Sequence, residues 1–187
     1  MFRINFQPGA LFRLLKIPLS EFTDNWFDGG AVINWELKEG NEKLSNSIDY
    51  SEMLDIVQTF LSAKIRQLKS EVNPIDRIAS TILKNPSGFS IDWFADQACL
   101  CHRQLNRKFV ERIGVGPKLF SRIVRFFNAY KYKEAHPNEP WLSVALEFGY
   151  SDYQHMVKDF QKFAFVTPNI WIDQDYNSPE RLLHLAQ

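Results

Sequence analysis

The sequence predicts a mainly α-helical protein: a double helix-turn-helix domain joined by a long linker helix, preceded by a small helical region with one candidate strand. Two observations predict this class. Apolar residues recur at helical spacing through most of the chain. Two pairs of short helices, each joined by a tight turn, recur about fifty residues apart. With 187 residues, the chain can bury a core without disulfides.

The first 71 residues are expected to form a helical region of their own. Phe2 to Phe6 alternates around Ile4 and precedes a Pro-Gly pair, which predicts an edge strand ending in a turn. Short helices are expected from Pro8 to Lys16 and around Leu19 to Phe22, and a longer helix from near Ala31. Asp49 to Leu68 is predicted to be an amphipathic helix of about five turns.

A domain boundary is expected near residue 71, because Pro74 disfavours helix at Asn73 and the charge changes sign there. Residues 72–172 carry a net charge of +4, and the rest of the chain carries −4. The segment from Arg103 to Lys133 holds nine basic residues and one acid, Glu111. A solvated helix surface mixes both signs. The basic excess therefore predicts a polyanionic partner.

Every element after this boundary is predicted to be helical. Apolar residues from Ile75 to Ile82 share one face of the first helix. The following elements are Ser90 to Ala98 with Ser90 as N-cap, Cys101 to Ile113, a linker helix from Pro117 to about Glu134 with Phe120, Ile123, Phe126, Phe127 and Tyr130 as its core face, Trp141 to Phe148, and Ser151 to Phe163. Residues 173–187 are expected to form a C-terminal tail.

The two helix pairs repeat residue by residue. Ala95 and Ala145, the small residues of the leading helices, are fifty apart, whereas Phe109 and Phe160 in the trailing helices are fifty-one apart. A small residue in the leading helix permits close packing beneath the trailing helix, as a helix-turn-helix unit requires.

Three stretches of the two helix pairs carry a resemblance to a known family: Arg103-Gln104-Leu105-Asn106-Arg107-Lys108-Phe109, Gly114-Val115-Gly116-Pro117-Lys118-Leu119-Phe120, and Ala145-Leu146-Glu147-Phe148-Gly149-Tyr150-Ser151-Asp152 with His155 and Phe160. The chain from about Ile75 to Trp171 resembles the C-terminal DNA-binding region of AraC/XylS-type transcription regulators. The stretches Phe6-Gln7-Pro8-Gly9-Ala10 and Leu19-Ser20-Glu21-Phe22-Thr23-Asp24 resemble the end of the regulatory domain in a bacterial subgroup. The resemblance implies that residues 1–71 are a truncated regulatory region and residues 72–172 a DNA-binding domain.

The resemblance implies which side chains face DNA. In the first recognition helix these are His102, Arg103, Asn106 and Arg107, with Leu105 and Phe109 facing the core. The spacing agrees, since positions 103, 106 and 107 share one helix face. Arginine binds guanine with two hydrogen bonds, and asparagine reads adenine. The alternative is that these side chains contact phosphates only.

The matching positions in the second recognition helix are Tyr153, Gln154, Val157 and Lys158. This set is less basic, since Asp152, a candidate N-cap, and Asp159 offset Lys158 and Lys162. His155 is interpreted as a packing residue. Lys118 and Arg122 of the linker helix are expected to contact phosphates independently of sequence.

Three positions depart from the family pattern. Cys101 replaces the serine that usually caps the first recognition helix, and a thiol is a poorer acceptor. Phe165 stands at a turn position usually held by glycine, where a positive φ strains a bulky residue. Tyr153 replaces a common amide at a base-facing position.

The sequence was also searched for a metal site, an enzyme active site and features of a protein-interaction module. Cys99, Cys101 and His102 lack the second ligand pair of a zinc site, and no catalytic motif is found, so no enzyme, metal or cofactor is expected. A helical interaction module or decoy regulator that does not read DNA stays open.

The expected partners are double-stranded DNA, RNA polymerase, and a second copy of the chain through residues 49–68. A membrane partner is not expected, since no apolar run reaches about 18 residues. The first twelve residues do not resemble a signal peptide. With only two cysteines, the chain is expected in a reducing cytoplasm.

Overall fold

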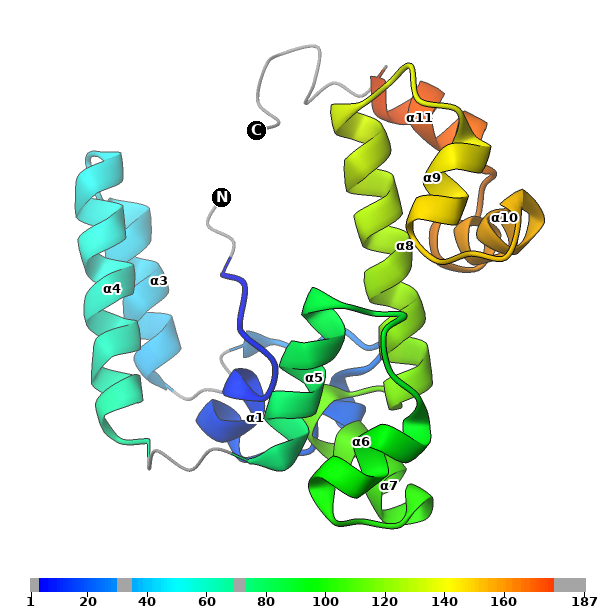
Figure 1. Cartoon of the computed structure of the whole chain (residues 1–187). Helices are drawn as coiled ribbons and strands as arrows, with labels where there is room; N and C mark the ends of the chain where they lie inside the picture. The colour runs from blue at the N-terminus through cyan, green and yellow to red at the C-terminus, as the bar shows by residue number, and fades with distance from the viewer. Residues whose placement is uncertain (1–3, 30–34, 69–72, 177–187) are drawn as a thin grey trace. The chain divides into compact units, whose positions relative to one another are not determined.

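The computed structural model of the chain describes residues 4–29, 35–68 and 73–176 (Figure 1). These residues are mostly helical and include no strand, so the predicted mainly α class is confirmed. The strand expected from Phe2 to Phe6 is absent from the described residues 4–6, where Ile4 and Phe6 are exposed. A strand is not stable without a partner to pair with, and none lies beside it in the described ranges. Residues 2 and 3 lie outside those ranges.

Short helices form at both predicted places near the N-terminus, α1 (Ala10–Leu15) and the 3-10 turn η1 (Leu19–Phe22). The next helices, α3 (Trp35–Asn46) and α4 (Tyr50–Arg66), lie side by side as a hairpin (Figure 1). The start expected near Ala31 lies outside the described residues. Asp49 begins α4 by accepting the N–H of Glu52 at 2.8 Å. No residue of α4 is buried, despite its apolar stripe.

The predicted helices of the next segment are confirmed as α5 (Pro74–Lys84), α6 (Ile91–Ala98) and α7 (His102–Ile113). The apolar face of α5 is buried as expected, through Ile75, Ile78, Ala79 and Ile82. Ser90 is the N-cap of α6 and accepts the N–H of Trp93 at 3.1 Å. In Figure 1, α1 and α5 lie together with the α6–α7 pair.

The C-terminal part contains α8 (Pro117–Ala135), α9 (Trp141–Glu147), α10 (Tyr153–Ala164) and α11 (Pro168–Tyr176). Its core joins α8, α9, α10 and the turn between α9 and α10 through Ala129, Val144, Ala145, Tyr150, Met156 and Phe160. Two expectations need correction. Phe127 is 51% exposed, and Val124 and Ala129 are among the buried positions of α8 instead. The tail expected from residue 173 is helical to Tyr176 as part of α11.

The chain forms two compact units, and their division does not follow the boundary expected at residue 71. One unit comprises Met1–Thr81 and Ser90–Pro117, and the other comprises Ile82–Phe89 and Lys118–Gln187. The physical reason lies in the first unit, where the N-terminal segment packs on the first helix pair. Thr23, for example, donates a hydrogen bond to the carbonyl of Gly114 at 2.9 Å.

The repeat is visible in the backbone of both helix pairs. The turn after the leading helix is left-handed at Cys99 (φ 52°) and at Gly149 (φ 73°), fifty residues later. The trailing helix is followed by a left-handed residue at Gly114 (φ 97°) and at Phe165 (φ 61°), fifty-one residues later. Phe165 therefore has the positive φ that the sequence predicts.

Candidate nucleic-acid interface

The α6–α7 pair is held by a buried inner face. Leu105 and Phe109 of α7 are fully buried, and Ala95 of α6 is 4% exposed. The turn between the helices is closed by Leu100, whose N–H donates to the Ala95 carbonyl at 3.0 Å. The equivalent turn of the second pair has the same bond, from Tyr150 to Ala145 at 2.9 Å. Each trailing helix therefore packs against its leading helix through predicted core residues.

The outer face of α7 carries Arg103, Arg107 and Lys108. All three side chains are exposed, and none forms an ion pair or hydrogen bond with any part of the chain that the structure describes. Arg103 and Arg107 are four residues apart, so they lie on the same side of the helix. These cations are available to a ligand in solution.

Most of the other basic residues between 103 and 133 have partners within the chain. Arg112 binds Asp76 through two hydrogen bonds of 2.9 and 2.7 Å. Lys133 is buried and donates to the carbonyls of Pro137 and Glu139 at 2.6 Å. Arg122, Arg125 and Lys131 also pair with acidic side chains. The net charge of +8 counted from the sequence over residues 103–133 therefore overstates the charge that this segment offers to a polyanion.

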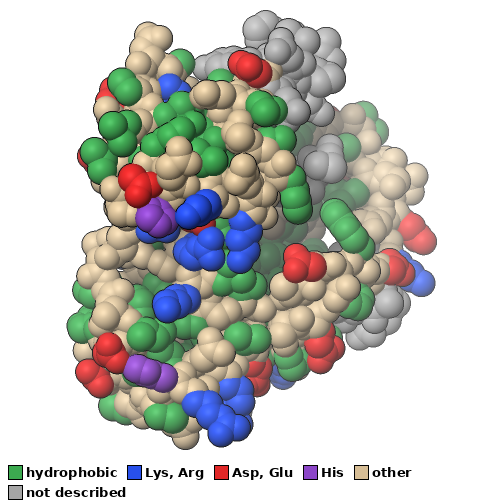
Figure 2. Space-filling view, turned by 90° about the vertical axis from the view of Figure 1, so that its right-hand side faces the viewer, with side chains coloured by type: hydrophobic (Ala, Val, Ile, Leu, Met, Phe, Trp, Pro, Cys, Tyr) green, Lys and Arg blue, Asp and Glu red, His purple; other side chains and the backbone are tan. Residues whose placement is uncertain are grey.

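His102 and Asn106, predicted to face DNA with the arginines, are exposed but have neighbours in the chain. Nε2 of His102 lies 2.8 Å from Oδ1 of Asp92 on α6. The amide oxygen of Asn106 lies against Gly116, where an added Cβ would come within 2.7 Å of it. Both side chains therefore have polar neighbours, whereas Arg103 and Arg107 form no hydrogen bond or ion pair with the described residues. Figure 2 shows a face where histidine side chains lie next to acidic ones, with Lys and Arg gathered nearby.

The two linker-helix residues differ in their surroundings. Lys118 is exposed in the first turn of α8, with no ion pair to a described residue. Arg122 is bound by Asp159 of α10, with 3.1 Å from Nε to Oδ1. Asp159 is shared with Arg125, and the Arg122 side chain is 39% exposed, so the ion pair reduces the charge that Arg122 can offer to phosphates without removing it.

The second trailing helix, α10, exposes Gln154 and Lys158, whereas Tyr153 and Val157 are half-buried. Asp159 is 2% exposed and accepts hydrogen bonds from Arg122 and Arg125. The Asp159 charge is therefore compensated within the chain and does not lie on the exposed face of α10. Its charge is covered by α8, so the outer face of α10 is less acidic than the sequence suggests.

A hydrogen-bonded group stands at the start of α10. Asp152 is the N-cap, as predicted, and accepts the N–H of His155 at 2.8 Å. This bond from the His155 backbone lowers the pKa of Asp152 below its ordinary value. The ring of His155 lies 2.8 Å from Asp152 and 2.6 Å from Ser151. His155 is interpreted from the sequence as a packing residue, and its ring is hydrogen-bonded within an exposed helix start.

The interactions of Arg125 were not identified from the sequence. Its guanidinium lies 4.0 Å from the centroid of the Tyr150 ring, and Nη1 donates to the Gly149 carbonyl at 3.2 Å. Burial and the nearby Asp159 charge raise the pKa of Tyr150 well above its ordinary value. Arg125 therefore ties α8 to the turn of the second helix pair. The sequence predicted only that Arg125 lies in the linker helix.

The residues considered for metal binding or catalysis do not form a site in the described ranges. Cys99 and Cys101 are free and exposed, and no group of three or more described His, Cys, Asp and Glu residues is arranged to hold a metal ion.

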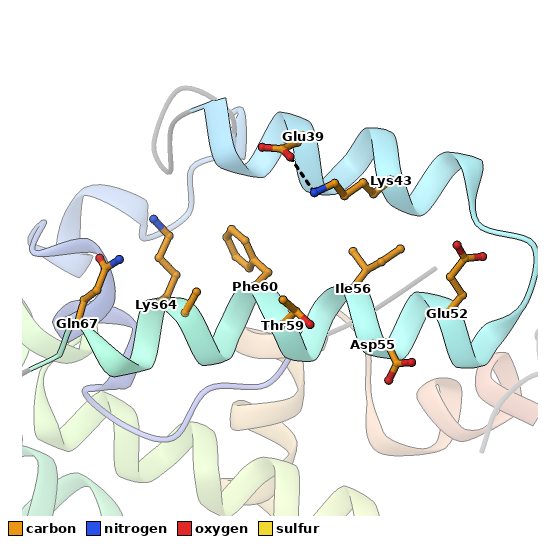
Figure 3. Close-up of a pocket in the computed structure, with 11 residues that line it drawn as sticks. Glu39, Lys43, Glu52, Asp55, Ile56, Thr59, Phe60, Lys64 and Gln67 are labelled. Carbon is orange, nitrogen blue, oxygen red and sulfur yellow. Dashed lines mark ion pairs between the residues drawn. The ribbon is translucent and has the colours of Figure 1, made fainter.

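A cavity of about 420 Å³ lies between α3 and α4. Ile56 and Phe60 point from α4 toward α3, and the Glu39–Lys43 pair (2.7 Å) lies opposite them (Figure 3). This cavity has an apolar middle and a charged rim.

None of the described helices is both long enough and apolar enough to span a bilayer. The chain matches no model of a known protein family, and no curated protein matches it.

Proposed function

We propose that this protein is a transcription regulator that binds double-stranded DNA sequence-specifically, with α7 as the principal reading helix. The observation that carries this proposal is a set of exposed cations on α7 that form no ion pair with any described residue: Arg103, Arg107 and Lys108. They project from the trailing helix of a pair whose inner face is buried. A helix presented in this way fits the major groove, where arginine pairs with the two acceptors of guanine.

His102 and Asn106 flank these cations on α7. In the proposal, the Asp92 contact orients His102, and Asn106 reads adenine after leaving Gly116. Lys118 supplies a phosphate contact at the start of α8.

The second pair is proposed to bind an adjacent groove through Tyr153, Gln154, Val157 and Lys158. With Asp159 covered by Arg122 and Arg125, its face repels phosphates less than the sequence suggests. Lys158 is nevertheless its only proposed cation. We therefore expect α7 to supply more of the sequence preference than α10.

The proposal is tested by measuring how one arginine substitution and one lysine substitution change the affinity for selected and for random duplexes. Arg107→Ala should lose about 1–3 kcal/mol on the preferred duplex and relax the choice at one base pair. Lys118→Ala is the matched control, and it should weaken all duplexes equally and reduce the salt dependence of binding. Equal weakening of selected and random DNA by Arg107→Ala would refute base reading by Arg107.

A second candidate function, a helical interaction or decoy module, is favoured by exposed apolar side chains. Leu142 and Leu146 lie four residues apart on α9 and are 54% and 56% exposed. The absence of any buried residue from α4 favours self-association through residues 49–68. An interaction module would associate with itself or another protein while showing no preference among duplexes. RNA polymerase as a partner and a cytoplasmic location accompany the regulator proposal.

A further inference from the structure

Three elements of the first unit meet at one carboxylate. Asp76 of α5 is 8% exposed and binds the guanidinium of Arg112, in the last turn of α7, through two hydrogen bonds. Arg13 of α1 approaches the same carboxylate, with 4.0 Å from Nε to Oδ2. The ring of Phe12, also on α1, lies 4.6 Å below the guanidinium of Arg112. The end of α7 is therefore held between α5 and α1.

A second contact fixes the residue that ends α7. Gly114 is the C-cap of α7, and its carbonyl accepts the hydroxyl of Thr23 at 2.9 Å. An added Cβ on Gly114 would lie 3.1 Å from that hydroxyl and 3.2 Å from the Leu19 carbonyl. The η1 turn thus packs directly on the end of the helix.

The approach of α1 to Asp76 depends on a glycine. Gly9 precedes α1 with φ 76°, and an added Cβ would lie 2.0 Å from Oδ1 of Asp76. A side chain here meets both a backbone conformation that favours glycine and the carboxylate that binds Arg112. Gly9 therefore allows the segment to approach close enough to contact the end of α7.

We propose that residues 9–23 act as a positioning clamp for α7, and that they set its orientation in the groove of DNA. This inference rests on the proposed function. The clamp holds the C-terminal end of the helix, whereas the residues that would touch bases lie earlier in it, from His102 to Arg107. Any change that loosens residues 9–23 would therefore alter which bases Arg103 and Arg107 reach.

The clamp makes a prediction that a purely structural role does not make. A helix that is free to tilt keeps its charges near the phosphates, so random duplexes remain bound. Base contacts depend on distance and angle, so the preference for the selected duplex falls. The ratio of the two affinities is the informative quantity. A loss of folded protein would lower both affinities and leave that ratio unchanged.

Thr23→Val and Thr23→Ser provide the matched test in the full chain. Valine keeps the shape of threonine without the hydroxyl, whereas serine keeps the hydroxyl. Thr23→Val should reduce the ratio of selected to random affinity by about 2-fold to 10-fold, as loss of one hydrogen bond allows. Thr23→Ser should restore the ratio. Arg112→Lys, which keeps the charge without the paired geometry, should reduce the ratio in the same direction.

The outcomes separate the two claims. If the wild type shows no preference among duplexes, the proposed function fails and the clamp fails with it. If the wild type shows a preference and both Thr23→Val and Arg112→Lys retain it, the clamp is refuted while the proposed function stands. An equal loss of affinity for selected and random duplexes also refutes the clamp. Fluorescence anisotropy well below the unfolding temperature supplies all of these affinities.

Discussion

Arg122 of α8 donates from Nε to Oδ1 of Asp159 on α10 at 3.1 Å, and Asp159 is 2% exposed. The two residues are 37 positions apart, and each looks like a surface charge in the sequence. Together with Arg125 they form an internal charge group that joins the linker helix to the second helix pair. Two arginines share one carboxylate, so the group joins the two elements and keeps a net positive charge on partly exposed side chains.

Arg122→Ala should therefore destabilise the protein. The buried Asp159 carboxylate would lose one of its two partners, and the remaining solvent access of Arg122 moderates the cost. We expect a loss of about 1–3 kcal/mol in the free energy of unfolding in urea. Lys118→Ala, in the same helix, should change it by less than about 0.5 kcal/mol. Equal stability of the two variants would show that the pair contributes nothing.

Phe165→Gly should stabilise the protein. Phe165 has φ 61° and is 86% exposed, so glycine relieves the backbone with little loss of packing. We expect a gain of about 0.5–1 kcal/mol after the greater flexibility of unfolded glycine is counted. Phe165→Ala controls for the side chain, because alanine keeps the strain. Gly114→Ala, at the equivalent position, should destabilise the protein, and thermal unfolding of the three variants gives the comparison.

Cys101→Ser should strengthen the start of α7. Cys101 is the N-cap, and a hydroxyl accepts a backbone N–H better than a thiol. The expected gain is about 0.5–1 kcal/mol in thermal unfolding. Cys99→Ser lies in the left-handed turn just before the cap and should have little effect. The interpretation of Cys101 as a weak cap is wrong if the two variants behave alike.

The Asp152 N-cap of α10 should make the free energy of unfolding depend on pH in the acidic range. The His155 backbone bond lowers the pKa of Asp152 below its ordinary value of 3.8, so the unfolded chain takes up this proton first. The stabilisation is fully present above that value and is lost as pH falls through the folded-state pKa. The difference in stability between wild type and Asp152→Ala should shrink between about pH 5 and pH 2. A constant difference over this range would contradict the assigned cap.

Much of the fold was predictable because its signals are local. The apolar spacing from Ile75 to Ile82 and the Ser90 and Asp152 caps each depend on a few neighbouring residues. The left-handed conformation at Phe165 was expected from the family resemblance, in which glycine usually holds this position. The repeat of helix pairs follows from Ala95 and Ala145, fifty residues apart at matching positions, and both are buried.

The parts that were missed depend on contacts between distant residues. The two compact units do not divide at residue 71, and the N-terminal segment packs on α7 through contacts such as the hydrogen bond between Thr23 and Gly114, which are 91 positions apart. Charge counting failed at Asp159 and Arg122 for the same reason. The faces of α8 were partly misassigned, since spacing alone did not separate exposed Phe127 from buried Ala129.

Selection of bound sequences from a pool of random duplexes tests directly whether the chain reads DNA sequence. Sequence-specific binding through α7 predicts one recurring motif among the recovered duplexes, and the Arg107→Ala variant should lose the preference at one base pair of that motif. Recovered sequences with no enrichment over the starting pool, obtained with folded protein, would contradict this function.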